Sequence, residues 1–159
     1  MIFITTGTQF PFERLLKYMA EWAVSNPKVK IIAQAGKTKY FSEGIATYEY
    51  LSPEDYLAIV KQASIIVGHA GSGTIITACE HGIPAIIMPR RFDLQEHRSE
   101  HQLGMAKEFS KREGVYIAYT KSQLFELLKQ YKKLKPVSKE ITQEKEMLVH
   151  FLKEKIFSV

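Results

Sequence analysis

Short β-rich runs alternate with helix-length amphipathic segments along the chain, and this alternation limits the possible folds more than any other feature of the sequence. The runs are rich in Val, Ile and aromatic residues, which favour strands, and most are bounded by turn-forming residues. Strands that regularly alternate with helices are typical of βα units and a parallel sheet. The expected strands are Ile2–Thr5, Val29–Gln34, Ala46–Tyr50, Ser64–Gly68, Pro84–Met88 and Val115–Ala118.

The segments between these strands place apolar residues at helical spacing. Ser52 marks the clearest helix start, because a serine N-cap precedes Pro53 at the first helical position and acids fill the first turn. We therefore expect an α/β fold: one Rossmann-like domain over residues 1–135, with a parallel sheet of about six strands and helices on both faces. The expected helices are Phe12–Val24, Ser52–Gln62, Ser72–His81, His97–Lys111 and Lys121–Lys132. Residues 136–159 form a separate C-terminal segment, in which we expect a helix over Ser138–Phe157 that packs on the domain or on a partner.

Size and composition suit one globular domain. The chain has 159 residues, 45% of them hydrophobic and 25% charged. Its apolar runs are far shorter than the roughly 20 residues that a membrane-spanning helix needs, and the N-terminus has no basic segment typical of a secretory signal. Cys79 is the only cysteine, which excludes an internal disulfide and fits a reducing compartment. We therefore expect a cytoplasmic protein.

The positive charge is concentrated at the C-terminal end. Residues 1–128 carry 14 basic and 13 acidic side chains, a net charge of +1, whereas residues 129–159 carry 8 and 4, a net charge of +4. Such a segment can face an anionic membrane, an acidic partner or nucleic acid, or can be a solvated helix face. The sequence leaves these alternatives open.

A glycine-rich turn follows the strand Ser64–Gly68, with the sequence His69-Ala70-Gly71-Ser72-Gly73-Thr74. Glycines let the backbone approach a ligand closely, and the free N–H groups at the start of the next helix favour phosphate. The turn lacks the lysine of a Walker A loop and differs from the G-x-G-x-x-G dinucleotide pattern, which disfavours ATP hydrolysis. By itself the turn is either a phosphate-binding loop or an ordinary turn between a strand and a helix.

Two further turns follow strands in the same way. The first strand leads into a small, hydroxyl-rich turn that contains Gly7 and Thr8, and the strand that ends at Met88 leads into Pro89-Arg90. In a doubly wound sheet all three turns face one crevice at the carboxyl ends of the strands, although they can also be ordinary βα turns. The third segment adds groups suited to a phosphorylated sugar, since arginine neutralises phosphate while histidine and glutamine bind hydroxyls. Its polar residues are Arg90, Glu96, His97, His101 and Gln102.

His97 and His101 lie four residues apart on a predicted helix and therefore share a face. A zinc site needs at least a third protein ligand, and the sequence provides none at a recognisable spacing. We expect no metal site.

Taken together, these motifs resemble a known family. The segments His69–Thr74, Gly82-Ile83-Pro84, Pro89-Arg90 and His101-Gln102 are similar, in order and spacing, to the C-terminal domain of family 28 GT-B glycosyltransferases over roughly residues 1–115. Within that family the likeness is greater to small soluble subunits of two-subunit UDP-sugar transferases, including those of exopolysaccharide and capsule assembly. The resemblance implies half of a GT-B fold.

The resemblance also implies roles for individual residues. Gly7, Thr8, Gly73 and Thr74 would face the donor diphosphate, Leu51 would lie near the uracil pocket, and Gln102 would bind hydroxyls of the transferred sugar. Many members carry a ribose-binding carboxylate where this chain has Thr77, and Glu80 either replaces it or is a surface residue. The full set of candidate donor-binding residues is Gly7, Thr8, Leu51, His69, Ala70, Gly71, Ser72, Gly73, Thr74, Thr77, Arg90, Glu96, His97, His101 and Gln102.

The implied reaction is an inverting transfer of a hexose, GlcNAc or galactose, from a UDP-sugar to a polyprenyl-diphosphate-linked acceptor. It uses no metal and no other cofactor, and helix N-termini and arginine stabilise the leaving diphosphate. The general base belongs to the other half of the GT-B fold in single-chain relatives, so we expect it on a partner, with His69 as the alternative; His69 otherwise has a structural or donor-contacting role.

The expected partner is a membrane-associated, acceptor-binding subunit that holds this chain at the inner face of the membrane. Leu148, Phe151 and Leu152 are the candidate contacts with it, unless they cover the core of their own domain. Two other classes stay open: a non-catalytic enhancer of such a transferase, and a stand-alone nucleotide-binding or RNA-binding module that uses Lys129–Lys155. The basic segment lacks interleaved aromatic residues, which argues against nucleic acid.

Overall fold

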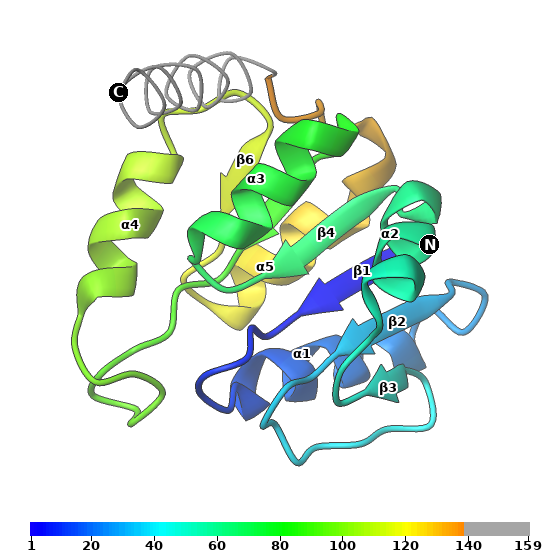
Figure 1. Cartoon of the computed structure of the whole chain (residues 1–159), viewed down its shortest axis with the longest axis horizontal. Helices are drawn as coiled ribbons and strands as arrows, with labels where there is room; N and C mark the ends of the chain where they lie inside the picture. Colours follow the sequence, from blue (N-terminus) through cyan, green and yellow to red (C-terminus); the bar gives the residue numbers. More distant parts are fainter. Residues whose placement is uncertain (139–159) are drawn as a thin grey trace, which may run out of the picture.

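The predicted strands form one parallel sheet. The computed structural model describes residues 1–138, and its six strands lie in the order β3-β2-β1-β4-β5-β6 (Figure 1). Because the order reverses between β1 and β4, the loops after these two neighbouring strands diverge and leave a crevice at their carboxyl ends. The strands are β1 (Ile2–Thr5), β2 (Ile31–Gln34), β3 (Ala46–Tyr48), β4 (Ile65–Gly68), β5 (Ala85–Ile87) and β6 (Val115–Ile117).

Helices cover both faces of the sheet, and side chains along β1 alternate between the two resulting cores. Helices α1 and α5 lie on one face of the sheet, and α2, α3 and α4 lie on the other (Figure 1). Ile2 and Ile4 pack in the first core, and Phe3 packs in the second. A strand buried on both faces needs a continuous apolar run, which is the pattern in the sequence. The helices are α1 (Glu13–Val24), α2 (Pro53–Gln62), α3 (Ser72–His81), α4 (His101–Phe109) and α5 (Lys121–Lys129), followed by the short 3₁₀ helix η1 (Tyr131–Lys133).

Local signals explain where several helices begin and end. The Ser52 hydroxyl accepts a hydrogen bond from the Asp55 amide at 3.0 Å, which confirms the predicted N-cap of α2. Thr120 and Gln123 form a reciprocal capping box at the start of α5. Gly82, with a φ of 61°, ends α3 in the left-handed conformation that favours glycine.

The helix predicted over His97–Lys111 is wrong at its start, because α4 begins only at His101. Residues before it form turns instead: the Glu96 amide donates to the Arg91 carbonyl at 3.1 Å, and Gln95 has a φ of +58°. Likewise α5 ends at Lys129 rather than at Lys132. The predicted helix over Ser138–Phe157 lies, apart from its first residue, outside the described residues.

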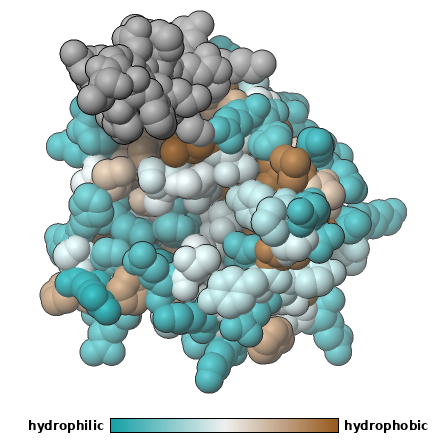
Figure 2. Space-filling view, in the orientation of Figure 1, coloured by the Kyte–Doolittle hydropathy of each residue, from teal (hydrophilic) through white to brown (hydrophobic). Residues whose placement is uncertain are grey.

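The chain still packs on the domain where its described part ends. Val137 is buried, and its amide donates to the Ile83 carbonyl at 3.3 Å. Among residues 1–138, helices are too short or too polar to cross a membrane. In the view of Figure 2, hydrophobic residues form small separate patches between hydrophilic ones.

Candidate functional site

The loops after β1, β4 and β5 converge on one pocket of about 450 Å³. Gly7, Gly71 and Arg90, one from each loop, all line it, as the sequence predicts for three turns that follow parallel strands. The pocket therefore lies at the point where the strand order reverses. Its lining residues are Thr5, Gly7, Thr8, Gln9, Phe10, Gln34, Tyr56, His69, Gly71, Ser72, Gly73, Thr74, Thr77, Arg90, His97 and Gln102.

The N-terminus of α3 opens into this pocket. Gly71 is its N-cap and supplies no side-chain acceptor, so the first backbone N–H groups of the helix lack a capping partner from that residue. Ser72 and Gly73, which begin the helix, are exposed and line the pocket. Free N–H groups and the positive end of the helix dipole favour an anion at this position.

Arg90 adds a buried positive charge to the same pocket. Its side chain is 2% exposed, its Nη2 donates to the carbonyls of Thr6 and Phe10, and its Nε has no hydrogen-bond partner. Burial lowers the pKa of Arg90 to about 10, partly offset by the charge of Glu96, so the guanidinium stays protonated at neutral pH. No Asp or Glu is among the pocket-lining residues of the described chain, which makes the pocket electropositive.

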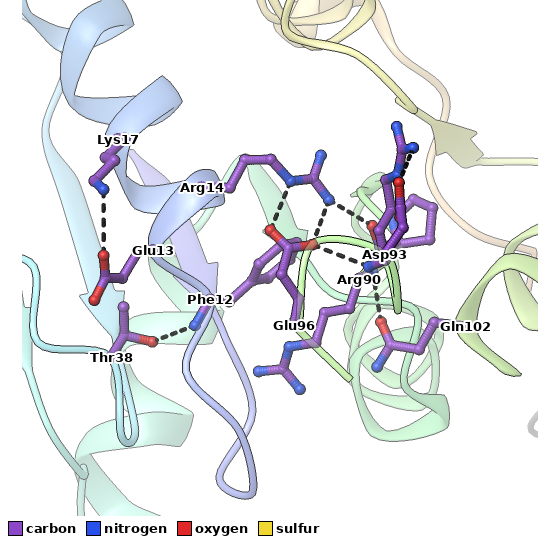
Figure 3. Close-up of polar contacts among 11 residues, drawn as sticks. Phe12, Glu13, Arg14, Lys17, Thr38, Arg90, Asp93, Glu96 and Gln102 are labelled. Atoms are coloured by element: carbon purple, nitrogen blue, oxygen red, sulfur yellow. Dashed lines mark hydrogen bonds and ion pairs between the residues drawn. The ribbon is translucent and has the colours of Figure 1, made fainter. Parts of the chain in front are cut away.

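Glu96 pairs with another arginine. Arg14 of α1 donates from Nε and Nη2 to the two carboxylate oxygens, each at 2.7 Å, and the Glu96 carboxylate also accepts from the Arg91 amide at 2.9 Å (Figure 3). Arg14 Nη2 donates in addition to the Pro89 carbonyl at 2.9 Å. These bonds hold the β5–α4 loop against α1 and fix one wall of the pocket.

The His69 ring lies between two glycines. A Cβ added to Gly7 would come within 2.5 Å of His69 Nε2, and one added to Gly71 within 2.2 Å of Cε1. Both positions therefore need glycine to make room for the imidazole, and Gly7 also has a φ of +76°. The other ring nitrogen, Nδ1, lies 3.1 Å from Gln102 Nε2.

The pKa of His69 is lowered to about 4. Burial is the largest cause, and the nearby charges of Arg90 and His97 contribute the rest. The imidazole is therefore neutral at neutral pH. Such a group is a weak base, and its Nδ1 is already in contact with the Gln102 amide. These properties favour a role in binding over one as general base.

A second part of the pocket lies between α2 and α3. The Tyr56 hydroxyl is 3.4 Å from Thr77 Oγ1, and its ring packs edge-on against Phe3 with centroids 5.3 Å apart. Gln34, at the end of β2, accepts a hydrogen bond from the Leu51 amide at 3.1 Å. Thr77 thus lines the pocket beside Tyr56, whereas Glu80 is exposed and does not line it.

Four candidate residues do not line the pocket. Leu51 and Ala70 only border it: their amides donate to the pocket residues Gln34 and Gln102, respectively. Glu96 is paired with Arg14, and His101 is exposed at the first position of α4.

His97 does line the pocket, but it precedes α4 and packs edge-on against Phe10, with ring centroids 5.2 Å apart. The prediction that it shares a helix face with His101 is therefore wrong. Residues 1–138 contain no cluster of three or more His, Cys, Asp or Glu side chains arranged to hold a metal ion.

Five lining residues were missed from the sequence: Thr5, Gln9, Phe10, Gln34 and Tyr56. A usable signal exists for Thr5 and Gln34, because each is the last residue of a predicted strand, at the edge where the pocket forms. Tyr56 lies inside a helix, and only the tertiary structure brings it to the pocket.

A six-stranded parallel sheet with a pocket at its switch point defines a Rossmann-like α/β domain of the kind that forms half of a GT-B glycosyltransferase. This chain belongs to the glycosyltransferase family 28 C-terminal domain family, whose model matches residues 1–156. The resemblance inferred from the motifs is confirmed.

Individual relatives are distant. The UDP-N-acetylglucosamine transferase subunit ALG13 of Yarrowia lipolytica is 22% identical over 137 residues, which cover 74% of this chain and 64% of that protein. The chain thus spans less than two thirds of the length of this curated relative.

Solved structures share the fold. A solution structure of ALG13 matches with a TM-score of 0.60 and 18% identity, over 85% of this chain and 87% of that one. MurG of Acinetobacter baumannii matches with a TM-score of 0.53 and 20% identity, over 84% and 42%. The kitacinnamycin glycosyltransferase matches with a TM-score of 0.60 and 17% identity, over 82% and 34%. The low coverage of the two larger enzymes fits a half-size domain.

Proposed function

We propose that this chain is the donor-binding half of a two-part glycosyltransferase and binds a UDP-sugar in the pocket at the sheet switch point. One observation carries the proposal: this pocket combines the N-terminus of α3 with the buried charge of Arg90, whose hydrogen bonds go to backbone carbonyls rather than to a carboxylate, and has no acidic side chain in its lining. A buried positive charge without a carboxylate partner is unfavourable unless a ligand compensates it. A nucleotide diphosphate supplies that negative charge.

The positions of the lining residues give the proposed ligand a direction in the pocket. The diphosphate would lie against the first turn of α3, near Ser72 and Gly73, and the nucleoside would extend toward Tyr56 and Thr77. Helix N–H groups and Arg90 would stabilise the diphosphate as it leaves, so the proposed reaction needs no metal ion.

The acceptor site belongs, in this proposal, to a second subunit. An inverting transfer needs a general base for the acceptor hydroxyl. The pocket has no carboxylate, and the low pKa of His69 makes it a poor base. We therefore propose that a membrane-associated partner supplies the base and binds a polyprenyl-diphosphate-linked acceptor, to which GlcNAc or galactose is transferred in polysaccharide assembly. The partner would hold this chain at the inner face of the membrane.

Isothermal titration with UDP, UDP-GlcNAc and UDP-galactose tests the donor half of the proposal, and transfer activity is then measured with and without the partner subunit. We expect the isolated chain to bind a uridine nucleotide and to transfer sugar only with the partner. Preference for ADP or NAD over all three ligands would contradict the proposal, and absence of nucleotide binding with retained stimulation of a partner would indicate an enhancer.

A charge variant locates the ligand. Ser72→Asp places a carboxylate in the first turn of α3, where it is favourable to the helix dipole but repels a diphosphate. We expect at least tenfold weaker UDP binding at unchanged or higher melting temperature. Ser122→Asp is the matched control, because Ser122 is exposed in the first turn of α5, outside the pocket.

A further inference from the structure

We propose that Gln102 is a positioning residue, which fixes the His69 imidazole as the neutral tautomer protonated at Nε2 and joins the loops after β4 and β5. The identity of the ligand that this imidazole faces rests on the proposed function. The position of Gln102 itself does not.

The contacts of the Gln102 amide determine its orientation. Gln102 lies in the first turn of α4 and is 5% exposed. Its Oε1 accepts from the Arg90 amide at 2.9 Å and from the Ala70 amide at 3.3 Å, one on each loop. Both partners are backbone donors, so only the oxygen can occupy this place, and Nε2 must be the atom 3.1 Å from His69 Nδ1.

The orientation of Gln102 then determines the tautomer of His69. An amide N–H can only donate, so Nδ1 accepts and the single proton of the neutral ring is on Nε2. Nε2 has no hydrogen-bond partner within residues 1–138, and the ring lines the pocket between Gly7 and Gly71. His69 therefore offers one N–H donor to an oxygen of a bound ligand.

The surroundings of His69 keep this donor in one state across the physiological pH range. The charged or titratable groups that face the ring are Arg90 and His97, both on the β5–α4 segment, and the β1 loop and the start of α3 add none. Burial and these neighbours hold the pKa of His69 at about 4. Ligand binding then requires no proton uptake by the ring.

Gln102→Glu separates the joining of the two loops from the control of the His69 tautomer, because the glutamate side chain has nearly the same shape as that of glutamine. One carboxylate oxygen can still accept from the Ala70 and Arg90 amides, but the other now accepts from Nδ1 instead of donating to it. We expect the pKa of His69 to rise by about 2 pH units or more and Nδ1 to become protonated. Histidine ¹⁵N and ¹H NMR measures both without any ligand. Gln9→Glu adds the same charge to the pocket lining from the β1–α1 loop and should raise the pKa less.

A pH profile gives the second readout. Between about pH 5.5 and 8.5 the UDP-GlcNAc affinity of Gln102→Glu should show a change around its new His69 pKa that the wild-type profile lacks. If His69 in Gln102→Glu stays neutral and protonated at Nε2 at pH 6, the positioning role is wrong. If the NMR result is as expected but wild type binds no nucleotide diphosphate, the positioning role stands and the proposed function fails.

Discussion

Gly7 and Gly73 line the same pocket for different physical reasons. Gly7 has a φ of +76°, and a methyl group there would contact His69 at 2.5 Å, so Gly7→Ala should lower the free energy of unfolding by ~1–3 kcal/mol. Gly73 is helical, and a methyl group there meets nothing within 4 Å, so Gly73→Ala should be neutral or stabilising by up to ~1 kcal/mol. Urea unfolding of both variants measures the difference.

The Gly73→Ala variant also tests the position of the ligand. The methyl group of Gly73→Ala would stand beside the first turn of α3, where the proposed diphosphate approaches the backbone, so we expect at least tenfold weaker UDP binding in a variant of normal stability. Wild-type affinity for this variant would show that the diphosphate does not lie against α3.

His69 should make the stability of the protein fall at acid pH. In the unfolded chain a histidine takes up a proton near pH 6.5, whereas the folded protein resists protonation until about pH 4. As pH falls through this window, the unfolded state binds the extra proton, and stability decreases by at most ~1.4 kcal/mol per pH unit. His69→Gln lacks this contribution, so its unfolding free energy should fall less steeply between pH 6.5 and 4. Parallel curves for the two proteins would contradict the low pKa.

The sequence predicts only part of the set of residues that line the pocket. Gly7, Gly71 and Arg90 each lie in the short turn after a strand, so the sheet edge brings them together whatever the details of packing. The contacts of Gln102 were not predictable, because they depend on an approach between α4 and His69 across 33 residues of sequence. The structure shows the Gln102 amide bonded to protein groups. The role in binding sugar hydroxyls that the resemblance implies stays a prediction.

At the scale of elements, the Arg14–Glu96 pair joins α1 to the β5–α4 loop. Both side chains are nearly buried, at 13% and 10% exposure, and removing one partner of such a pair leaves an uncompensated charge. Glu96→Gln should therefore lower the free energy of unfolding by ~2–4 kcal/mol and weaken ligand binding, because the loop carries Arg90.

Thermal and chemical unfolding measure this effect against a matched variant in the same loop. Asp93→Asn removes the carboxylate of the exposed Arg91–Asp93 pair and should change stability little, because solvent screens exposed pairs. Equal losses in the two variants would mean that the Arg14–Glu96 pair has no special role in holding the loop.

Elements with local signals were predicted better than those set by tertiary contacts. The N-cap at Ser52 and the β-rich runs act over a few residues, and the structure confirms them within one or two positions. The start of α4 was wrong because residues 91–100 bind other parts of the chain: Glu96 pairs with Arg14, and His97 packs on Phe10. Such distant partners outweigh helix propensity and leave no periodic pattern in the sequence.

At the scale of the whole molecule, the strand order concentrates binding groups at one edge of the sheet. Helices run antiparallel to the strands, so their N-termini lie at the edge where the pocket forms and their C-terminal ends lie at the opposite edge. A crevice at that opposite edge, lined by Trp22, Phe125 and Tyr131 between α1 and α5, is similar in size at about 400 Å³ but has an aromatic lining. The two sites therefore differ in the chemistry they suit.

Hydrogen exchange of residues 1–138, measured with and without ligand, tests whether the ligand binds at the pocket edge of the sheet rather than at the opposite edge. At a UDP-GlcNAc concentration 100 times its Kd, the folded state should gain about 2.7 kcal/mol. Beyond that uniform gain, local protection should be confined to the loops after β1, β4 and β5 and to the first turn of α3, because those backbone groups contact the proposed ligand. The crevice beside Trp22 is the internal control and should show only the uniform gain. Local protection there, with unchanged exchange at residues 69–74, would place the ligand at the wrong edge for a family 28 donor site and would contradict the binding mode proposed for this chain.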